Sequence, residues 1–445
     1  MKKIQLLLII NLTFILHSVV FAQANNDTIP GNLTLKQCIV YALRNQPAVK
    51  QASIDQEINE KDIKIALSSW LPQVTSSNLY EHYFKGSPVA TSGSAALPNI
   101  GSNISEYSAL GLQASQVIYN NDVLLAAKTA NYSRLYYKQN TISSQINVVS
   151  DVSKAFFDVL LSQRQLEIIN EDILRLQRSL KDAYSRYQSG VTDKIDYKQA
   201  TIALNNSIAS RKQIEEAIHS KLAYLKQIMG LNPANPVSLV YDSTRYEKEA
   251  IIDTNQRLDY TNRIEYQLLQ TERNIKGLSI PYYKWGFLPS VSAVGSYNWV
   301  YLNNRFSDLY SQSYPNAYAG VTLSFPIFTG TKRLQNLTRA KLQVERADLD
   351  IVNSQYTINT EYVQALASYK SNFTNWQVLK QNVDLAKDVY NVVSIQYREG
   401  IKVYLDVIVA QSDLRTAELN YYNALFQLLS SKIDLERSLG TLSVQ

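Results

Sequence analysis

Residues 187–200 read YQSGVTDKIDYKQA, and residues 397–410 read YREGIKVYLDVIVA. Tyr, Gly, Asp and Ala recur in the two stretches at the same spacing, which indicates an internal repeat. Each glycine ends one long stretch without glycine or proline and begins another. Because these two residue types interrupt helices, the repeat predicts pairs of long helices that meet at tight turns.

Four windows lack both glycine and proline, namely 112–189, 191–229, 331–399 and 401–439. Apolar residues recur at steps of three and four before each turn, as in coiled-coil seams. A helix from about residue 122 to 188 would be roughly 100 Å long, which exceeds any ordinary globular core. Shorter helical regions are predicted over 33–69 and after Gly190, and stacked end to end they would match one long helix.

Strands are predicted between the helices. Apolar and small polar residues alternate over 290–301 and 317–327, and this period of two over about ten residues is typical of transmembrane barrel strands. The alternation is weaker over 109–118 and ambiguous over 73–83. Both halves therefore read as half-length helix, strand, loop, strand, long helix, turn and half-length helix. The longer loop of the first half is placed at about 85–106.

The N-terminus has the order of a secretory signal. Lys2 and Lys3 precede an apolar run over 6–21 that ends in small residues, so residues 1–24 are predicted to be a signal peptide and the protein to leave the cytoplasm. The first repeat is then assigned to 25–230, a linker rich in Pro, Asn and Asp to 231–256, and the second repeat to 257–445.

Composition excludes several classes of protein. The net charge of +6 is spread along the chain, which does not favour nucleic acid as a partner, and three histidines offer no metal cluster. No nucleotide-binding, metalloprotease or serine-hydrolase motif is present, so we predict neither enzyme activity nor a cofactor. The single cysteine, Cys38, is interpreted as a buried small hydrophobe.

Four strands cannot close a barrel, and a membrane cannot satisfy their open edges. No later stretch is long and apolar enough for a spanning helix, so any membrane insertion must use strands. Copies of the chain are therefore expected to assemble, and three copies would give twelve strands.

The chain resembles the TolC-like outer-membrane efflux family over essentially its whole mature length. The residues that carry the resemblance are Leu33-Thr34-Leu35, Tyr41-Ala42-Leu43, Pro47, Leu71-Pro72, Leu288-Pro289, Leu323-Ser324-Phe325-Pro326-Ile327-Phe328, both Tyr-x-x-Gly turns and Leu439-Gly440-Thr441-Leu442. The resemblance implies an α+β membrane channel, a homotrimer with a twelve-strand barrel and a long antiparallel coiled-coil tunnel through the periplasm.

The function implied is a passive exit duct in the outer membrane of a Gram-negative bacterium. Such a duct works with a periplasmic adaptor and an inner-membrane pump, or in type I secretion, and the partner supplies the energy. A soluble periplasmic coiled-coil adaptor or scaffold is the alternative, although it would not explain two strand regions at equivalent places in both repeats. The exported substrate is not indicated by the sequence.

A gate is expected at the tip turns, because the family places its constriction there. Carried over by position, Tyr397 and Asp196 are the candidate closing pair, and Asp406 is the candidate ring acid. The remaining candidates are Lys402 and Tyr187, with the tip turns at Gly190 and Gly400. Rings of acids favour cations. Val409 stands where some members have a second acid, so a double ring is not expected. The competing interpretation is a glycine helix stop followed by a capping acid.

Aromatic residues of the predicted strand over 290–301 are candidates for the membrane interface. Tyr297, Trp299 and Tyr301 share one side of the strand, and amphipathic rings are favoured at the level of lipid headgroups. Trp285 fits either this role or ordinary barrel packing. Contact with outer-membrane lipid is therefore expected on this side of the sheet.

Overall fold

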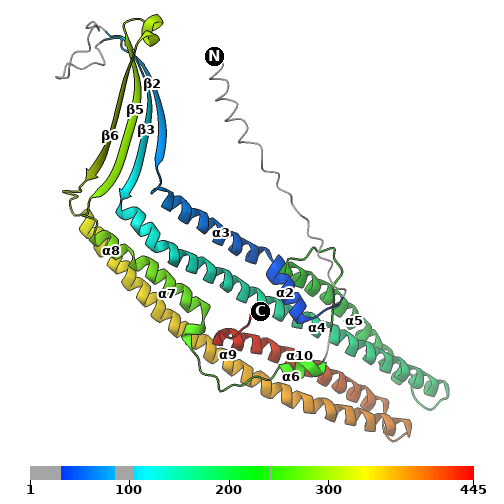
Figure 1. Cartoon of the computed structure of the whole chain (residues 1–445). Helices are drawn as coiled ribbons and strands as arrows, with labels where there is room; N and C mark the ends of the chain where they lie inside the picture. The colour runs from blue at the N-terminus through cyan, green and yellow to red at the C-terminus, as the bar shows by residue number, and fades with distance from the viewer. Residues whose placement is uncertain (1–31, 86–103, 241–242, 445) are drawn as a thin grey trace.

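The computed structural model describes residues 32–85, 104–240 and 243–444, which form a long molecule with a sheet at one end and helices over the rest (Figure 1). The predicted signal peptide and most of the predicted loop at 85–106 lie outside these residues. The elements are β1 (Asn32–Leu33), α2 (Leu35–Asn45), α3 (Pro47–Ser68), β2 (Gln73–His82), β3 (Glu106–Tyr119), α4 (Asn121–Gln188), α5 (Lys194–Met229), β4 (Ser238–Leu239), α6 (Ser243–Glu249), η1 (Tyr260–Asn262), α7 (Ile264–Gly277), α8 (Ser279–Lys284), β5 (Ser290–Asn303), η2 (Phe306–Ser311), β6 (Ser313–Ser324), α9 (Lys332–Arg398) and α10 (Tyr404–Leu439).

The predicted long helices are confirmed. The helices α4 and α9 contain 68 and 67 residues, and α5 and α10 contain 36 each. The helical region predicted over 33–69 is divided, because Gln46 adopts an extended conformation before Pro47. Proline disfavours the helical conformation of the residue before it, and it begins α3 at a position where its missing N–H costs nothing.

The four long strands form one antiparallel sheet in the order β2-β3-β5-β6. The register places Trp299 opposite Leu110 and Pro315, while Asn298 lies opposite Gly111 and Asn316. One face is thus rich in aromatic and aliphatic residues and the other is polar, as the alternation predicts.

Strand β6 lies closer to the N-terminus than the prediction of 317–327, because it begins at Ser313 and ends at Ser324. Pro326 cannot donate to a ladder and restricts the residue before it, so Phe325 and Ile327 leave the sheet.

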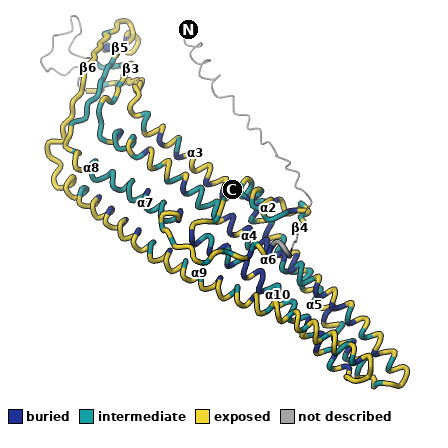
Figure 2. Tube along the Cα trace, turned by 60° about the horizontal axis from the view of Figure 1, so that its bottom comes forward, coloured by how far each residue is buried: buried dark blue, intermediate teal, exposed yellow. Residues whose placement is uncertain are grey.

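The main core lies in the middle of the molecule, where buried residues gather around α4 and α10 (Figure 2). The segment 231–256, predicted as a linker, contains β4, which pairs in parallel with β1, and α6. Tyr246 of α6 packs with its ring centroid 5.9 Å from that of Phe157 in α4. The buried Cys38 side chain also lies here, as predicted, and burial raises the pKa of its thiol to about 12.

Among the described residues, no helix is both long enough and apolar enough to span a membrane. The same residues contain no group of three or more His, Cys, Asp or Glu side chains that could hold a metal ion.

Candidate functional site

The two repeated turns lie together at the end of the molecule farthest from the sheet (Figure 1). Gly190 and Gly400 have φ angles of 71° and 80°, which L side chains rarely adopt. The amide of Gly190 donates to the carbonyl of Tyr187, and the next amide donates to Arg186, while Gly400 and Ile401 make the equivalent pair of bonds. Both turns are therefore Schellman caps, and the predicted glycine helix stops are confirmed.

A small buried cluster, the tip cluster, holds the two turns against each other. Its buried members are Ala183, Ala200, Tyr397, Tyr404 and Val407. Only 1% of Tyr404 is exposed, and the Ser179 hydroxyl donates to the Tyr404 hydroxyl over 3.0 Å. This bond joins α10 of the second repeat to α4 of the first.

Tyr397 and Asp196, the predicted closing pair, lie in the same neighbourhood. The Tyr397 side chain is 7% exposed, and its hydroxyl has no hydrogen-bond partner in the described chain. Burial raises the pKa of Tyr397, the charges of Asp196 and Asp182 raise it further, and the Arg186 guanidinium opposes them from 4.7 Å above the ring. Asp196 therefore acts on Tyr397 through its charge, without a hydrogen bond in one protomer.

The two repeated acids occupy equivalent positions in the first turns of α5 and α10. Burial and the charge of Asp193 raise the pKa of Asp196. Asp406 instead lies 3.6 Å from the Lys402 ammonium, and both side chains are partly exposed. In the competing interpretation the two repeated acids are capping acids. Both lie in the first turn of their helix, but the N-cap residues are Asp193 and Val403, and neither makes a side-chain cap bond.

Tyr187 and Tyr397 are equivalent in the repeat but have different surroundings. Tyr187 is 40% exposed and packs against Tyr197 with tilted rings whose centroids are 5.0 Å apart, while Tyr184 packs edge-on to Tyr197 at 5.6 Å. Tyr397 is buried against Tyr404 at 5.6 Å. The first repeat thus presents an exposed tyrosine patch at the tip, which the sequence analysis did not predict.

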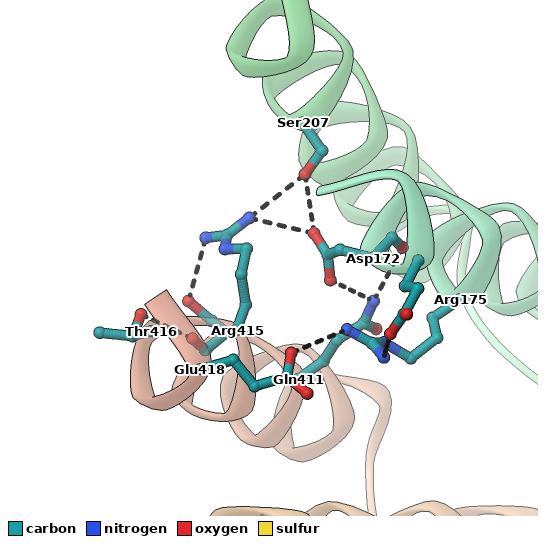
Figure 3. Close-up of polar contacts among 9 residues, drawn as sticks. Asp172, Arg175, Ser207, Gln411, Arg415, Thr416 and Glu418 are labelled. Atoms are coloured by element: carbon teal, nitrogen blue, oxygen red, sulfur yellow. Dashed lines mark hydrogen bonds and ion pairs between the residues drawn. The ribbon is translucent and has the colours of Figure 1, made fainter. Parts of the chain in front are cut away.

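A buried polar network lies between the tip cluster and the main core, and it joins α4, α5 and α10 (Figure 3). Asp172 of α4 is 1% exposed. Its carboxylate accepts from Ser207 at 3.0 Å, from Gln411 at 2.9 Å and from Arg415 at 3.2 Å. The sequence analysis missed this network, although Asp172 stands at seam spacing from Ile169 and Leu176 and so carried a signal.

An ion-pair chain flanks the network (Figure 3). The Arg175 guanidinium lies 3.7 Å from Glu418 of α10 and 3.8 Å from Glu171. Burial raises the pKa of Glu418 against the attraction of Arg175. Together with Asp172, Arg175 and Glu418 tie the second-repeat helix to the first-repeat pair in one polar layer, while Glu171 lies at its exposed border.

The predicted interface aromatics lie on the apolar face of the sheet. Tyr297 and Trp299 pack with ring centroids 4.5 Å apart, opposite Leu112 and Leu110 of β3. Tyr301 contacts Tyr310 of η2 at 5.1 Å. The sheet therefore brings all three rings to one side, at the half of β5 that is farther from the helices.

Solved structures share this fold. The channel described in "Crystal structures of CusC review conformational changes accompanying folding and transmembrane channel formation" superposes with a TM-score of 0.74 at 15% identity, covering 91% of both chains. The outer membrane protein VceC of Vibrio cholerae gives a TM-score of 0.70 at 17% identity and covers 91% of this chain and 96% of that one.

Sequence relatives agree with the structural comparison. "Outer membrane protein TolC" of Vibrio cholerae is 23% identical over 80% of this chain and 85% of its own length. "Probable efflux pump outer membrane protein TtgC" of Pseudomonas putida is 22% identical over 89% of this chain and 83% of its own. The family described as "Outer membrane efflux protein" matches residues 38–231 and 284–441, which is most of the chain. The resemblance seen in the sequence is thereby confirmed, and the chain belongs to the outer membrane efflux protein family.

Proposed function

We propose that this chain is the outer-membrane duct of an efflux or export system, in which three copies close a twelve-strand barrel above one helical tunnel. The observation that carries the proposal is the open four-stranded sheet. Strands β2 and β6 are its edges, and each has one side unpaired within the described chain. Because a membrane interior cannot satisfy such edges, β6 of one copy would pair with β2 of the next.

Exposed apolar stripes on the helices support the same side-by-side arrangement. Helix α9 exposes Leu342, Leu349, Tyr356 and Val363 at heptad spacing, and it continues with Val378, Leu385 and Val392. Helix α3, at the opposite edge of the protomer, exposes Ile54, Ile58 and Ile65. A stripe at each edge suits a head-to-tail contact that repeats around a ring.

The two faces of the sheet suit a barrel that separates water from lipid. The face that holds Gly111, Asn298 and Asn316 is polar, and the Asn298 amide donates to Asn316 over 2.9 Å. We assign this face to the lumen and the face with Tyr297 and Trp299 to the lipid, because transmembrane barrels alternate in this way.

The tips form the gate in this proposal. The tip cluster holds the turns together, Tyr397 and Asp196 close the passage between copies, and Asp406 contributes one acid per copy to a ring near Lys402. Relatives named as efflux pump outer membrane proteins support a pump as the partner, with a periplasmic adaptor between the two. The duct itself is passive, and the partner supplies the energy.

Single-channel conductance of the detergent-extracted oligomer in a planar bilayer tests the proposal. We expect a cation-selective pore that loses part of its selectivity in Asp406→Asn, because each copy then contributes one carboxylate fewer to the ring. Tyr397→Phe combined with Asp196→Ala should raise the conducting fraction of time. Glu399→Gln, which removes an exposed acid from the same turn, is the matched control for Asp406→Asn.

Each result tests a different part of the proposed function. Equal cation selectivity in Asp406→Asn and Glu399→Gln would contradict the acid ring but not the duct. An unchanged conducting fraction in the double variant would remove the closing pair. A verified oligomer of other than three copies would contradict the twelve-strand barrel.

A further inference from the structure

A cavity of about 350 Å³ lies where the sheet meets the helices. It is formed between the first turns of α4 and the short helix α8. Its lining residues are Tyr119, Asn121, Leu124, Leu125, Lys128, Leu278, Pro281, Tyr282, Trp285 and Leu288. The lining is largely apolar and includes one cation, Lys128. The gate and the duct proposed above make no use of it.

The cavity opens on the apolar face of the sheet. A register shift after Val117 pairs Tyr119 with Val291, which belongs to the same face as Trp299. A second cavity takes Ser290 and Ser324 from the polar face, so it lies on the other side. Asn121, Tyr282 and Leu288 line both cavities and form the wall between them.

That wall is fixed by hydrogen bonds. The Tyr282 hydroxyl donates to the Asp122 carboxylate, and the Asn121 amide donates to the Tyr282 carbonyl over 2.8 Å. The carboxylate and burial raise the pKa of Tyr282 to about 12, so the hydroxyl remains a donor at neutral pH. The cavity is therefore preformed rather than a gap between loose side chains.

The cavity is also remote from the edges at which copies would meet. It lies below β3 and β5, the two central strands, whereas β2 with α3 and β6 with α9 form the edges of the protomer. If copies associate through those edges, the cavity stays on the outer surface of the oligomer, at the junction between the sheet and the helices.

One cation lines the cavity, and a second lies against Trp285 in its wall. Lys128 lines it, and the Lys284 ammonium lies 5.6 Å from the ring centroid of Trp285, which is 47% exposed. Neither lysine forms an ion pair within the described part of the chain. The nearby acid Asp122 is already engaged by Tyr282. An apolar cavity beside two ammonium groups that are not paired with an acid in the described chain is complementary to an amphiphile that has a hydrocarbon chain and an anionic head.

We propose that this cavity binds a glycerophospholipid of the leaflet nearer the helices, with part of an acyl chain inside the cavity and the phosphate at Lys128 and Lys284. The proposal rests on the proposed insertion of the sheet into the membrane. Trp285 covers the acyl chain at headgroup level, where an indole is favoured. One bound lipid per copy would fix the depth at which the sheet meets the membrane surface.

The test uses the detergent-extracted full chain and phosphatidylglycerol with brominated acyl chains, which quench tryptophan fluorescence on contact. The quenching that disappears in Trp285→Phe reports the cavity. We expect the half-quenching lipid concentration to rise about tenfold or more at low salt in Lys128→Gln combined with Lys284→Gln, since each surface lysine contributes to the attraction of anionic lipid. Lys138→Gln, farther along α4, should change it less than about twofold.

The outcomes separate this site from the duct. In vesicles of the same lipid, quenching that disappears in Trp299→Phe reports insertion of the sheet. If that signal is absent, the proposed membrane insertion fails. The sheet can insert while the quenching of Trp285 is unchanged in the double lysine variant, or a brominated detergent without phosphate can quench Trp285 equally well. Either result would contradict the lipid site and leave the proposed duct intact. Unchanged conductance of the double lysine variant would show that its oligomer is intact.

Discussion

The middle of the molecule and its tips use the same local motif in different surroundings. Each repeat ends a helix with a left-handed glycine in the middle, at Gly230 and Gly440, and another at the tip, at Gly190 and Gly400. A Cβ on Gly230 would lie 2.6 Å from the Asn45 carbonyl oxygen, whereas one on either tip glycine would meet nothing within 4 Å. The middle is thus locked by tertiary packing, and the tips are held by a few side chains, as the proposed gate requires.

The largest difference in stability between the two regions is expected when a buried side chain in each is truncated to alanine. Phe156 is fully buried in the middle, so Phe156→Ala should lower the free energy of unfolding by about 4 kcal/mol. Val407→Ala in the tip cluster removes less buried surface, and about 1.5 kcal/mol is expected. Thermal unfolding followed by circular dichroism in detergent measures both changes.

Hydrogen exchange localises these two effects. Val407→Ala should raise exchange at residues 397–410 and leave the middle protected, while Phe156→Ala should raise exchange throughout the helices. Equal losses of stability from the two variants would show that the tips belong to the same cooperative unit as the middle, which contradicts the distinction.

The next largest difference in stability is expected between alanine substitutions at a glycine of the middle and at a glycine of the tip. In Gly440→Ala the new Cβ would lie 2.7 Å from the Asn262 carbonyl oxygen. Overpacking adds to the cost of a left-handed alanine, so about 3 kcal/mol is expected. Gly400→Ala bears only the backbone cost of about 1 kcal/mol. The same unfolding assay compares them, and a tip variant as damaging as the middle one would show hidden packing at the turn.

The buried network at Asp172 marks the border between the two regions. Asp172→Asn removes the charge that faces Arg415 and turns one of its two acceptor oxygens into a donor, so either Gln411 or the Ser207 and Arg415 pair loses its acceptor. About 2 kcal/mol of stability should be lost. Arg415 is 30% exposed on its side chain and can rehydrate, which limits the loss. Exchange should rise in α10 from Tyr404 to Arg415 and remain low near Leu425.

Ser207→Ala is the control for that variant. It removes the hydrogen bond that Ser207 donates to the carboxylate and the one it accepts from Arg415, but it keeps the charge of Asp172, so it should cost less. If Asp172→Asn leaves exchange in α10 unchanged, the network does not couple the two repeats.

The sequence predicted the repeated architecture because its signals are local. Glycine, proline and strand alternation act through the conformation of a few neighbouring residues, so helix lengths, turns and faces of the sheet follow from them. The break at Gln46 and the true limits of β6 were available from Pro47 and Pro326 but were not used. Both departures lie beside prolines.

The remaining features depend on contacts distant in the chain. Tyr397 is buried and the equivalent Tyr187 is exposed, because Tyr397 packs with Ala183 and Ala200 of the first repeat and lies under Arg186. Only its contact with Tyr404, which stands where the first repeat has Lys194, is local. The position of α6 likewise depends on the packing of Tyr246 against Phe156 and Phe157, about ninety residues earlier. No local sequence pattern indicates that contact. Sequence periodicity cannot supply such pairings.

Acidification should affect the two regions in opposite directions, although only slightly. In the middle, burial opposes ionisation of Glu265, but hydrogen bonds from Arg263 hold its pKa below the usual 4.5. The stability contributed by ionised Glu265 is fully present above pH 4.5 and is lost as the pH falls through the lowered pKa. At the tip, burial and Asp193 raise the pKa of Asp196 above the usual 3.8. Protonation therefore favours the folded tip as the pH falls through the raised pKa toward 3.8.

Hydrogen exchange at residues 187–200, corrected for its intrinsic pH dependence, measures this last effect. Protection should rise by less than about tenfold on acidification, because Asp196 is partly solvated and its repulsion is screened. Asp193→Asn should reduce the pH dependence by removing the nearby charge, and Asp196→Asn should abolish it. Protection that falls at the tip as the pH is lowered would mean that the ionised Asp196 is stabilised there by a partner in a neighbouring copy, and the tips would then be held by charge between copies rather than by the tip cluster within each.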